Sequence, residues 1–527
     1  MRPNRRGVLP LLLLALALAS CGGLDESLPA GTGHVTVSLT DAPSFAFDNV
    51  WVTVRRVWFH KVGTAAFDNT ASGWIRFTLD NGATVNLAAL SGDNNLVTVF
   101  DNLALTAGTY RQMLLFLEPT ESALTVSATA KNLRFNNQVD AGTLHAALRV
   151  PNAAQGIRIA DRVFQVDNGA LLRLAIDFDI GRDVVPVNRD GVSEFILKPQ
   201  LRSFDLDDAG AIVGFIDNTA ARDTTAFFEI KAEQIDTRIN ARVVRRATAV
   251  DNNTGRFVLY PLDPGSYDLV VRGINYDTFI VRSVGPVAAG TTPVSNPRTF
   301  AAPITMDNAL LPDYRVGAVV SPAGSRVLFY QTLTQGDAVP YEIRVRHVDP
   351  FTGRFDNFSL SNGPIHAGAY NNGSPVFTLA GGGGSFQVIA EAPFHTRSLS
   401  IDIDSSSAGS DIPVVNPSVP ASLVISGTMT VPFLQTGVTL DNGIIFVVHG
   451  GQIVSRVPRT SADMATGNHP YMTAGLPGGF AEAFYGVTAL GWSVPDDFLA
   501  VASPAAVADL RSADDVVNLT MTSVPAP

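Results

Sequence analysis

The sequence is poor in cysteine and in lysine. Cys21 is the only cysteine among 527 residues, so no disulfide can form within the chain and stability must come from packed cores. Only four of the 37 basic residues are lysines; the other 33 are arginines. We interpret this imbalance as codon usage rather than as a sign of phosphate binding.

Long apolar runs and catalytic motifs are also missing. After the first twenty residues the most apolar run is Ile444–Val448, far short of the roughly 20 residues that a membrane-spanning helix needs. No Gly-x-Ser-x-Gly or His-Glu-x-x-His pattern occurs, and the glycine run Gly381–Gly384 leads to Ser385, not to the lysine of a phosphate-binding loop. We therefore expect no enzyme and no cofactor.

The charge balance is acidic. The formal net charge is −11, and removal of residues 1–20 with their three arginines would make it (37 − 3) − 48 = −14. Such a surface disfavours nucleic acid and anionic lipid as partners.

The first 21 residues have the layout of an export signal. Arg2, Arg5 and Arg6 precede the apolar stretch Val8–Ala19, which is too short to span a bilayer. Leu18-Ala19-Ser20-Cys21 then resembles the lipobox of bacterial lipoproteins. The resemblance implies cleavage after Ser20 and lipidation of Cys21, and therefore a lipid-anchored protein with the membrane as a partner. The alternative is an ordinary signal peptide cut nearby.

The residue that follows Cys21 bears on location. In proteobacterial lipoproteins an Asp at this position favours the inner membrane, whereas this chain has Gly22. The resemblance therefore implies the cell envelope, and the outer membrane where the cell has one. Residues 22–33 show no periodicity and are typical of a flexible spacer.

The mature chain favours strands. His34–Leu39 alternates, with Val35, Val37 and Leu39 on one face, and turn residues separate many similar short runs. The sequence therefore predicts an all-β protein of tandem Greek-key β-sandwiches, immunoglobulin-like or transthyretin-like. The further strands expected early in the chain are Val50–Val62, Trp74–Leu79, Thr84–Leu87, Tyr110–Glu118, Ala123–Ala128, Ile157–Ile159, Leu171–Ile180 and Glu194–Leu201.

Four stretches in the first half carry a family resemblance. They are His34–Pro43, Leu105–Gln112, Leu174–Ile180 and Ile196–Arg202. In this order they resemble the lipoprotein domain of unknown function numbered 4382, with one departure at Thr106, where many members have proline. The resemblance implies a β-rich envelope domain and supplies no catalytic residues.

The second half contains a repeat. Asn253-Thr254-Gly255-Arg256-Phe257 recurs 98 residues later as Phe351-Thr352-Gly353-Arg354-Phe355. The first copy leads to Pro264-Gly265-Ser266-Tyr267, and the whole resembles transthyretin-like, carboxypeptidase-regulatory-like β-sandwiches. Gly265 suits a turn that needs a positive φ.

These observations divide the chain into six parts. The predicted units are a signal peptide (1–20), a tether (21–33), the N-terminal domain (34–205), a transthyretin-like sandwich (207–306) and two further repeats (307–420 and 421–524).

Three carboxylates are the candidate metal ligands. Asp177 and Asp179 flank Phe178 on one face of a strand, and Asp41 follows another strand. Paired carboxylates bind Ca²⁺, but that ion takes about 6–8 oxygen ligands, so we favour a solvated or turn-facing pair with Phe178 in the core. For Asp41 the simpler role is turn capping.

We expect a non-enzymatic structural or binding protein, a string of sandwiches that recognises an envelope protein or glycan along an extended array. One alternative is a carbohydrate- or calcium-dependent surface protein using Asp41, Asp177 and Asp179; a second is an envelope enzyme. Trp51, Trp58 and Trp74 are candidates for sugar stacking, although core positions suit them better.

Overall fold

A computed structural model describes the chain from residue 31 to residue 523. The internal residues it leaves out are 43–45, 63–71, 91–95, 152, 190–191, 238–239, 295–302, 310, 323, 335–337, 371–374, 419–421, 480–482, 494–497 and 503–505. The predicted signal peptide, Cys21 and most of the predicted tether lie outside the described residues. We call residues 32–205 the N-terminal domain, 207–306 the first repeat segment, 307–420 the second repeat segment and 421–524 the C-terminal segment.

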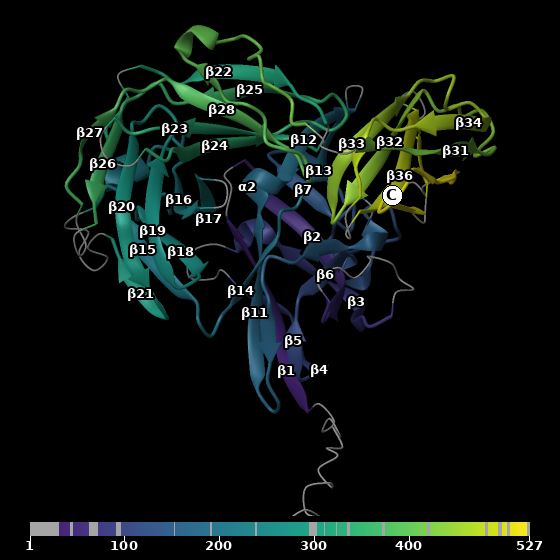
Figure 1. The fold of residues 1–527 in the computed structure, drawn as a ribbon, viewed down its shortest axis with the longest axis horizontal. Coiled ribbons are helices and arrows are strands. Elements are labelled where there is room, and N and C mark those ends of the chain that lie inside the picture. The colour runs from purple at the N-terminus through teal and green to yellow at the C-terminus, as the bar shows by residue number, and fades with distance from the viewer. Residues whose placement is uncertain are drawn as a thin grey trace, which may run out of the picture.

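The protein is an all-β, multidomain β-sandwich, as the sequence predicts (Figure 1). Each described α-helix is a single turn of four residues: α1 (Val126–Thr129), α2 (Ile180–Asp183) and α3 (Asn218–Ala221). No helix in the described part of the chain is long and apolar enough to cross a membrane.

The N-terminal domain packs two large sheets around one core, and β5 and β10 form a separate two-stranded sheet. One sheet has the order β14-β11-β1-β4, and the other joins eight strands in the order β12-β13-β8-β7-β2-β6-β9, with β3 on β2. Val35, Val37 and Leu39 of β1 are fully buried in the core between them, as their alternation predicts. The strands are β1 (Thr32–Ala42), β2 (Asn49–His60), β3 (Ile75–Asn86), β4 (Val97–Thr106), β5 (Gly108–Tyr110), β6 (Gln112–Leu117), β7 (Gln138–Ala141), β8 (Leu144–Arg149), β9 (Ile157–Ile159), β10 (Phe164–Val166), β11 (Leu171–Asp179), β12 (Val184–Arg189), β13 (Val192–Leu197) and β14 (Arg202–Asp205).

One predicted strand of this domain is wrong. Ala123–Ala128 contains the start of helix α1. The Thr125 side chain accepts a hydrogen bond from the backbone N–H of Ala128 at 3.2 Å, which caps the first turn of a helix. Trp74–Leu79 and Thr84–Leu87, predicted as separate strands, form the single strand β3.

The two repeat segments use the same hairpin. In each, an aspartate four residues before the glycine closes a tight turn: Gly255 N–H donates to the Asp251 carbonyl at 2.8 Å, and Gly353 N–H to that of Asp349 at 2.7 Å. Both glycines have a positive φ, 72° and 74°. The following strands pair antiparallel with the strands that begin each segment, β18 with β15 and β25 with β22.

A single six-stranded sheet crosses the predicted boundary at residues 306/307. Its order is β17-β16-β19-β20-β26-β27, with β20 and β26 parallel. Leu269 and Val281 face the core of the first repeat segment, whereas Val270 and Ile280 face that of the second. The strands of the first repeat segment are β15 (Gly210–Phe215), β16 (Glu229–Asp236), β17 (Ala241–Ala249), β18 (Arg256–Leu262), β19 (Gly265–Arg272), β20 (Thr278–Val287) and β21 (Gly290–Pro293). Those of the second are β22 (Tyr314–Val319), β23 (Arg326–Gln331), β24 (Tyr341–His347), β25 (Arg354–Leu360), β26 (Ile365–Ala369), β27 (Thr378–Gly381), β28 (Phe386–Glu391) and β29 (Ile401–Ile403).

The C-terminal segment folds back onto the N-terminal domain. The run Ile444–Val448 forms most of β32, and its alternate residues face opposite sides. Ile445 and Val447 enter the segment's own core, whereas Ile444 and Phe446 pack against Val185, Val187 and Ile196 of the N-terminal domain. The expected extended array is therefore wrong, because the outer face of this sheet is apolar and is covered by another segment.

The strands of the C-terminal segment are β30 (Ser422–Leu423), β31 (Ile425–Val431), β32 (Asn442–His449), β33 (Gln452–Arg459), β34 (Gly467–Met472), β35 (Leu476–Pro477), β36 (Phe484–Ser493), β37 (Phe498–Ala502), β38 (Ala506–Asp509), β39 (Asp515–Val516) and β40 (Leu519–Ser523). In Figure 1 the repeat segments lie to the left of the N-terminal domain and the C-terminal segment to its upper right, while β1, β4 and β11 project below.

Candidate functional site

The three predicted carboxylates lie at the same end of two parallel strands. In the register of β1 with β11, Thr40 stands opposite Asp177, Asp41 opposite Phe178, and Ala42 opposite Asp179. Phe178 is fully buried in the core, as predicted. Asp177 is not at a solvated edge, however: the residue is only 8% exposed and Asp41 only 1%.

The side chain of Arg246, from β17 of the first repeat segment, lies against this end of β1 and β11. Its guanidinium forms an ion pair with Asp177 and donates to Thr40 Oγ1 at 3.0 Å and to the Asp41 carbonyl at 2.9 Å. Burial lowers the pKa of Arg246 to about 10. The Asp177 carboxylate is thus paired with a cation of the chain itself, which argues against a Ca²⁺ site built on this residue.

Two of the carboxylates serve the local backbone. Asp41 Oδ1 accepts the N–H of Ile180 at 3.0 Å, and Asp179 Oδ1 accepts that of Arg182 at 3.2 Å, which caps the short helix α2. Burial raises the pKa of Asp41 well above its ordinary value and that of Asp179 to about 6. The two carboxylates that bind the start of helix α2 are therefore unfavourable to ionise in the folded chain.

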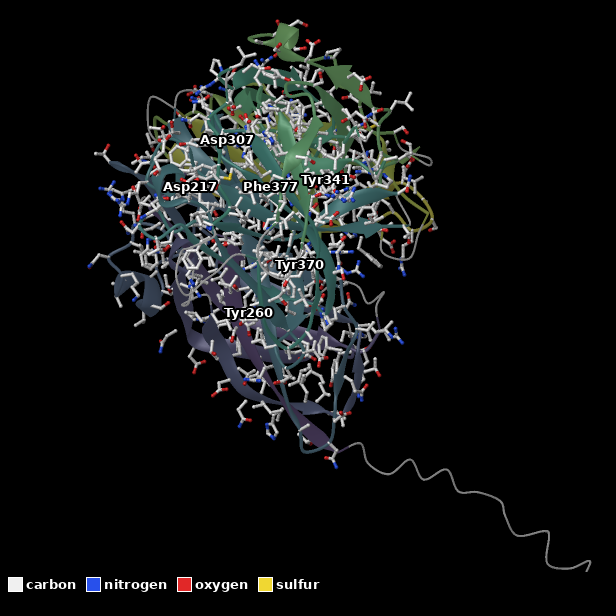
Figure 2. All side chains as sticks on the ribbon, turned by 90° about the vertical axis from the view of Figure 1, so that its left-hand side faces the viewer. Asp217, Tyr260, Asp307, Tyr341, Tyr370 and Phe377 are labelled. Carbon is white, nitrogen blue, oxygen red and sulfur yellow. The ribbon has the colours of Figure 1, made fainter. Side chains whose placement is uncertain are left out.

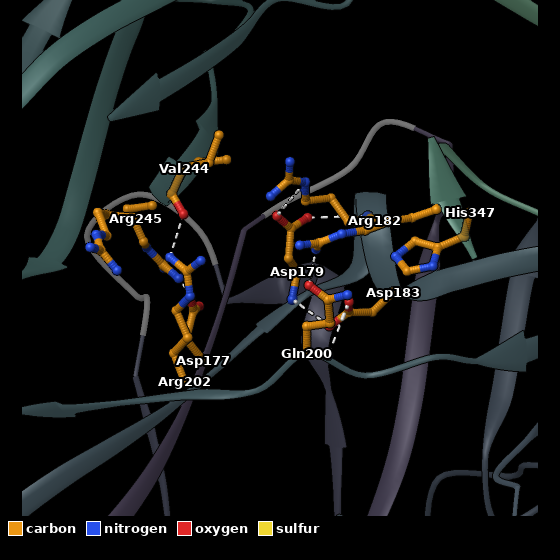
Figure 3. A pocket seen from close by; sticks show the side chains of 12 residues that line it. Asp177, Asp179, Arg182, Asp183, Gln200, Arg202, Val244, Arg245 and His347 are labelled. Atoms are coloured by element: carbon orange, nitrogen blue, oxygen red, sulfur yellow. Dashed lines mark hydrogen bonds and ion pairs between the residues drawn. The ribbon is translucent and has the colours of Figure 1, made fainter. Parts of the chain in front are cut away.

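The same helix carries two further buried groups. Asp183 accepts the N–H of Gln200 at 3.3 Å, and burial next to Asp179 raises the pKa of Asp183 to about 8. Arg182 pairs with Asp179 at 3.7 Å and with Glu342 of the second repeat segment. Figure 3 shows Asp179, Arg182 and Asp183 around one small polar space that Gln200, Arg202 and His347 also line.

A larger cavity of about 550 Å³ adjoins this cluster, and we call it the junction cavity. All four segments contribute to its lining. The two spaces share six residues: Arg182, Gln200, Arg202, Val244, Arg245 and Arg326. Its arginines are Arg158, Arg182, Arg202, Arg245, Arg326 and Arg397; its acids are Asp161, Asp236, Glu342 and Glu391. The volume lies within the roughly 300–1,000 Å³ typical of small-molecule sites.

Several of these charges are paired. Arg326 binds Glu391 at 2.8 Å, Arg397 pairs with the same carboxylate and donates to Tyr330 at 2.8 Å, and Arg182 pairs with Glu342. The pairs hold the wall of the second repeat segment in place. No local motif in the sequence predicts this site, because its arginines come from separate strands and loops.

A second polar group lies outside the junction. Asp277, Asp307 and His366 present ligand atoms within 4.8 Å of one another, and Asp307 lies on the face shown in Figure 2. His366 Nε2 and Asp277 Oδ2 are 2.9 Å apart and share a hydrogen bond that a metal ion would have to replace. We assign no ligand to this group.

The aromatic candidates belong largely to the fold. Trp58 and Trp74 are buried together, 6.0 Å between ring centroids, and Trp51 donates to Asp140 at 3.1 Å. A stacking platform for sugars needs exposed rings, so these residues do not form one.

Comparison with known proteins identifies the N-terminal domain. Residues 32–199 match the family model described as Domain of unknown function (DUF4382), which confirms the resemblance for this part of the chain. No curated protein matches.

The similar solved structures are distant. The TIE protein of Bacillus anthracis is 8% identical, aligns over 96% of this chain and 76% of its own, and has a TM-score of 0.15. A mutant type II cohesin–X-dockerin complex from Acetivibrio cellulolyticus gives 22% identity and a TM-score of 0.14 over 19% of this chain, which spans 58% of that chain's length. A double mutant of shaft pilin SpaA from Lactobacillus rhamnosus GG is 13% identical. It aligns over 40% of this chain and 98% of its own, with a TM-score of 0.17. Likenesses at these TM-scores support no inference about this chain.

Proposed function

We propose that this chain is a lipid-anchored protein of the bacterial cell envelope with a non-enzymatic binding role. Leu18–Cys21 supports the anchor, Gly22 supports the outer membrane, and an envelope protein or glycan is the class of partner. The junction cavity carries the binding role, because four segments enclose a polar space of ligand size.

The direction of the chain fits an anchor at its N-terminal end. Strand β1 begins at Thr32, at the tip of the projecting part of the N-terminal domain (Figure 1). The repeat and C-terminal segments lie at the opposite end. A lipid on Cys21 would therefore hold the junction cavity away from the membrane surface.

The nature of the lining favours binding over catalysis. It consists mainly of arginines and carboxylates, several of them joined in ion pairs, with Tyr330 and His395 beside them. His395 Nδ1–H donates to the Pro393 carbonyl at 2.7 Å, so this nitrogen already has a backbone partner. Side chains that are already held in ion pairs and hydrogen bonds are suited to binding and orienting a ligand with polar or charged groups.

The anchor is tested by Cys21→Ser in the native host. We expect the wild type in the membrane fraction, with a mass that includes acyl chains, and Cys21→Ser in the soluble fraction or unprocessed, because the thiol is the acylation site. Ser20→Ala, which leaves the thiol in place, is the control. Membrane association of mature-sized Cys21→Ser would contradict the proposal.

A further inference from the structure

The junction cavity concentrates positive charge in an acidic chain. The whole chain has a formal net charge of −11, yet the lining has six arginines and four acids, an excess of 6 − 4 = 2 positive charges. A cavity with low-dielectric walls strengthens such an imbalance, because water screens it less than it would on the surface.

Two of the arginines, Arg202 and Arg245, form hydrogen bonds to uncharged groups instead of ion pairs among the described residues. Arg202 donates to the carbonyl of Val244, and Arg245 donates to Gln234 Oε1 at 3.2 Å. Among the described residues, neither guanidinium has a carboxylate within ion-pair distance, whereas Arg182, Arg326 and Arg397 all do.

Arg202 and Arg245 also stand close to other cations. Burial, together with Arg182, Arg245 and Arg326, lowers the pKa of Arg202 to about 10, and the nearby Asp161 offsets only part of this shift. The two residues come from different segments, Arg202 from β14 and Arg245 from β17. Like charges from two segments face one space, and a bound anion would relieve their repulsion.

We propose that the junction cavity binds a small organic anion through its carboxylate or phosphate oxygens, held chiefly by Arg202 and Arg245. The assignment rests on the proposed binding role and names its ligand chemistry. A guanidinium presents a planar fork of N–H donors that matches both kinds of oxyanion. The paired arginines and Tyr330 form the more rigid wall against which the rest of the ligand packs.

The binding test uses the full-length protein in detergent and titration calorimetry. Citrate serves as the carboxylate probe, inorganic pyrophosphate as the phosphate probe and maltotriose as a neutral probe, all at an ionic strength fixed with chloride. We expect saturable binding of citrate, pyrophosphate or both, with a Kd on the order of 1 mM or tighter. Binding of one anion alone identifies the source of the oxygens.

Three variants measure how much the positive charge of Arg245 contributes to anion binding. Arg245→Gln removes a charge without stranding a carboxylate and should weaken anion binding about tenfold, the scale of one charge-assisted hydrogen bond. Arg222, which is exposed and outside the cavity, supplies the matched control Arg222→Gln. Arg245→Lys keeps the charge and should weaken binding less than Arg245→Gln; thermal melts check that all three variants fold.

Three results would overturn the assignment: no saturable binding of either anion, maltotriose binding that matches the anions, or equal effects of Arg245→Gln and Arg222→Gln. Its failure is distinct from failure of the anchor. If the wild type is in the membrane fraction but binds neither anion, only the proposed ligand chemistry is wrong. If the protein binds an anion but Cys21→Ser remains in the membrane fraction at its mature size, only the proposed anchor is wrong.

Discussion

At the residue scale, guanidinium groups from one segment are inserted between acids of another. Arg246 of the first repeat segment binds Asp177 of the N-terminal domain, and Arg182 of the N-terminal domain binds Glu342 of the second repeat segment. Buried pairs of this kind gain little net stability, since desolvation offsets much of the attraction, but losing one partner is costly. They therefore fix how the segments meet.

Asp183 gives this cluster a pH dependence. Because burial raises its pKa to about 8, the folded chain keeps a proton that the unfolded chain releases near pH 4. Its contribution to stability is present below about pH 4 and is lost as the pH rises toward about 8, by up to about 1.4 kcal/mol per pH unit. Between about pH 5 and about pH 7, the unfolding free energy of the wild type should fall relative to that of Asp183→Asn.

Urea unfolding at several pH values measures this difference. Asp208→Asn, at an exposed position, is the control and should follow the wild type. A wild-type minus Asp183→Asn difference that does not change with pH would show that Asp183 is ionised in the folded chain across this range.

Sequence reasoning reached these residues only in part. The period of two in β11 placed Asp177 and Asp179 on one face and Phe178 in the core, because alternation is a local property. Alternation cannot predict the partner Arg246, which lies 69 positions beyond Asp177. The abundance of arginine, which we interpret as codon usage, does not say where the arginines gather. Six of those arginines line one cavity, a placement that only long-range strand pairing creates.

At the scale of elements, short continuous apolar runs mark strands that are buried on both faces. Leu269–Val271 in β19 and Phe279–Val281 in β20 belong to the sheet that separates the cores of the two repeat segments. The repeated turn motif is visible in the sequence because its Thr and Gly act locally, and the structure adds the aspartates Asp251 and Asp349 to it. The partner of the outer sheet face was not, because a run of apolar residues does not say what will cover it.

Neighbouring substitutions in β20 test this sharing. Ile280→Ala should destabilise the core of the second repeat segment by about 2–5 kcal/mol, and Val281→Ala, somewhat less, that of the first, because the two side chains point to opposite faces. Amide hydrogen exchange should then rise mainly in β23 and β28 for Ile280→Ala and mainly in β15 and β18 for Val281→Ala. The same pattern for both variants would contradict a shared sheet.

At the scale of the whole molecule, the C-terminal segment is held by an apolar interface with two partners. Its sheet face around Phe446 packs on β12 and β13 of the N-terminal domain. Phe351 of the second repeat segment adds two edge-to-face contacts, 5.5 Å from Phe446 and 5.7 Å from Trp492 between ring centroids. Burial of this face favours the compact arrangement over a string of separate sandwiches.

The repeat itself supplies the substitution that tests this interface. Phe351 occupies the position of Asn253 in the first copy, where the side chain is exposed. Phe351→Asn keeps the turn, in which the backbone N–H of residue 351 donates to Asp349 at 2.7 Å, but removes both ring contacts. Two aromatic pairs contribute about 1–3 kcal/mol beyond burial, so the C-terminal segment should detach more often and amide exchange in β32 and β36 should rise.

The control for this test is Phe433→Asn, which alters a ring that is 70% exposed in the same C-terminal segment. Its exchange should match the wild type. A larger radius of gyration in solution scattering for Phe351→Asn, but not for Phe433→Asn, would show detachment directly. Unchanged exchange in β32 and β36 would mean that the two ring contacts of Phe351 contribute nothing to holding the C-terminal segment in the closed arrangement around the junction cavity.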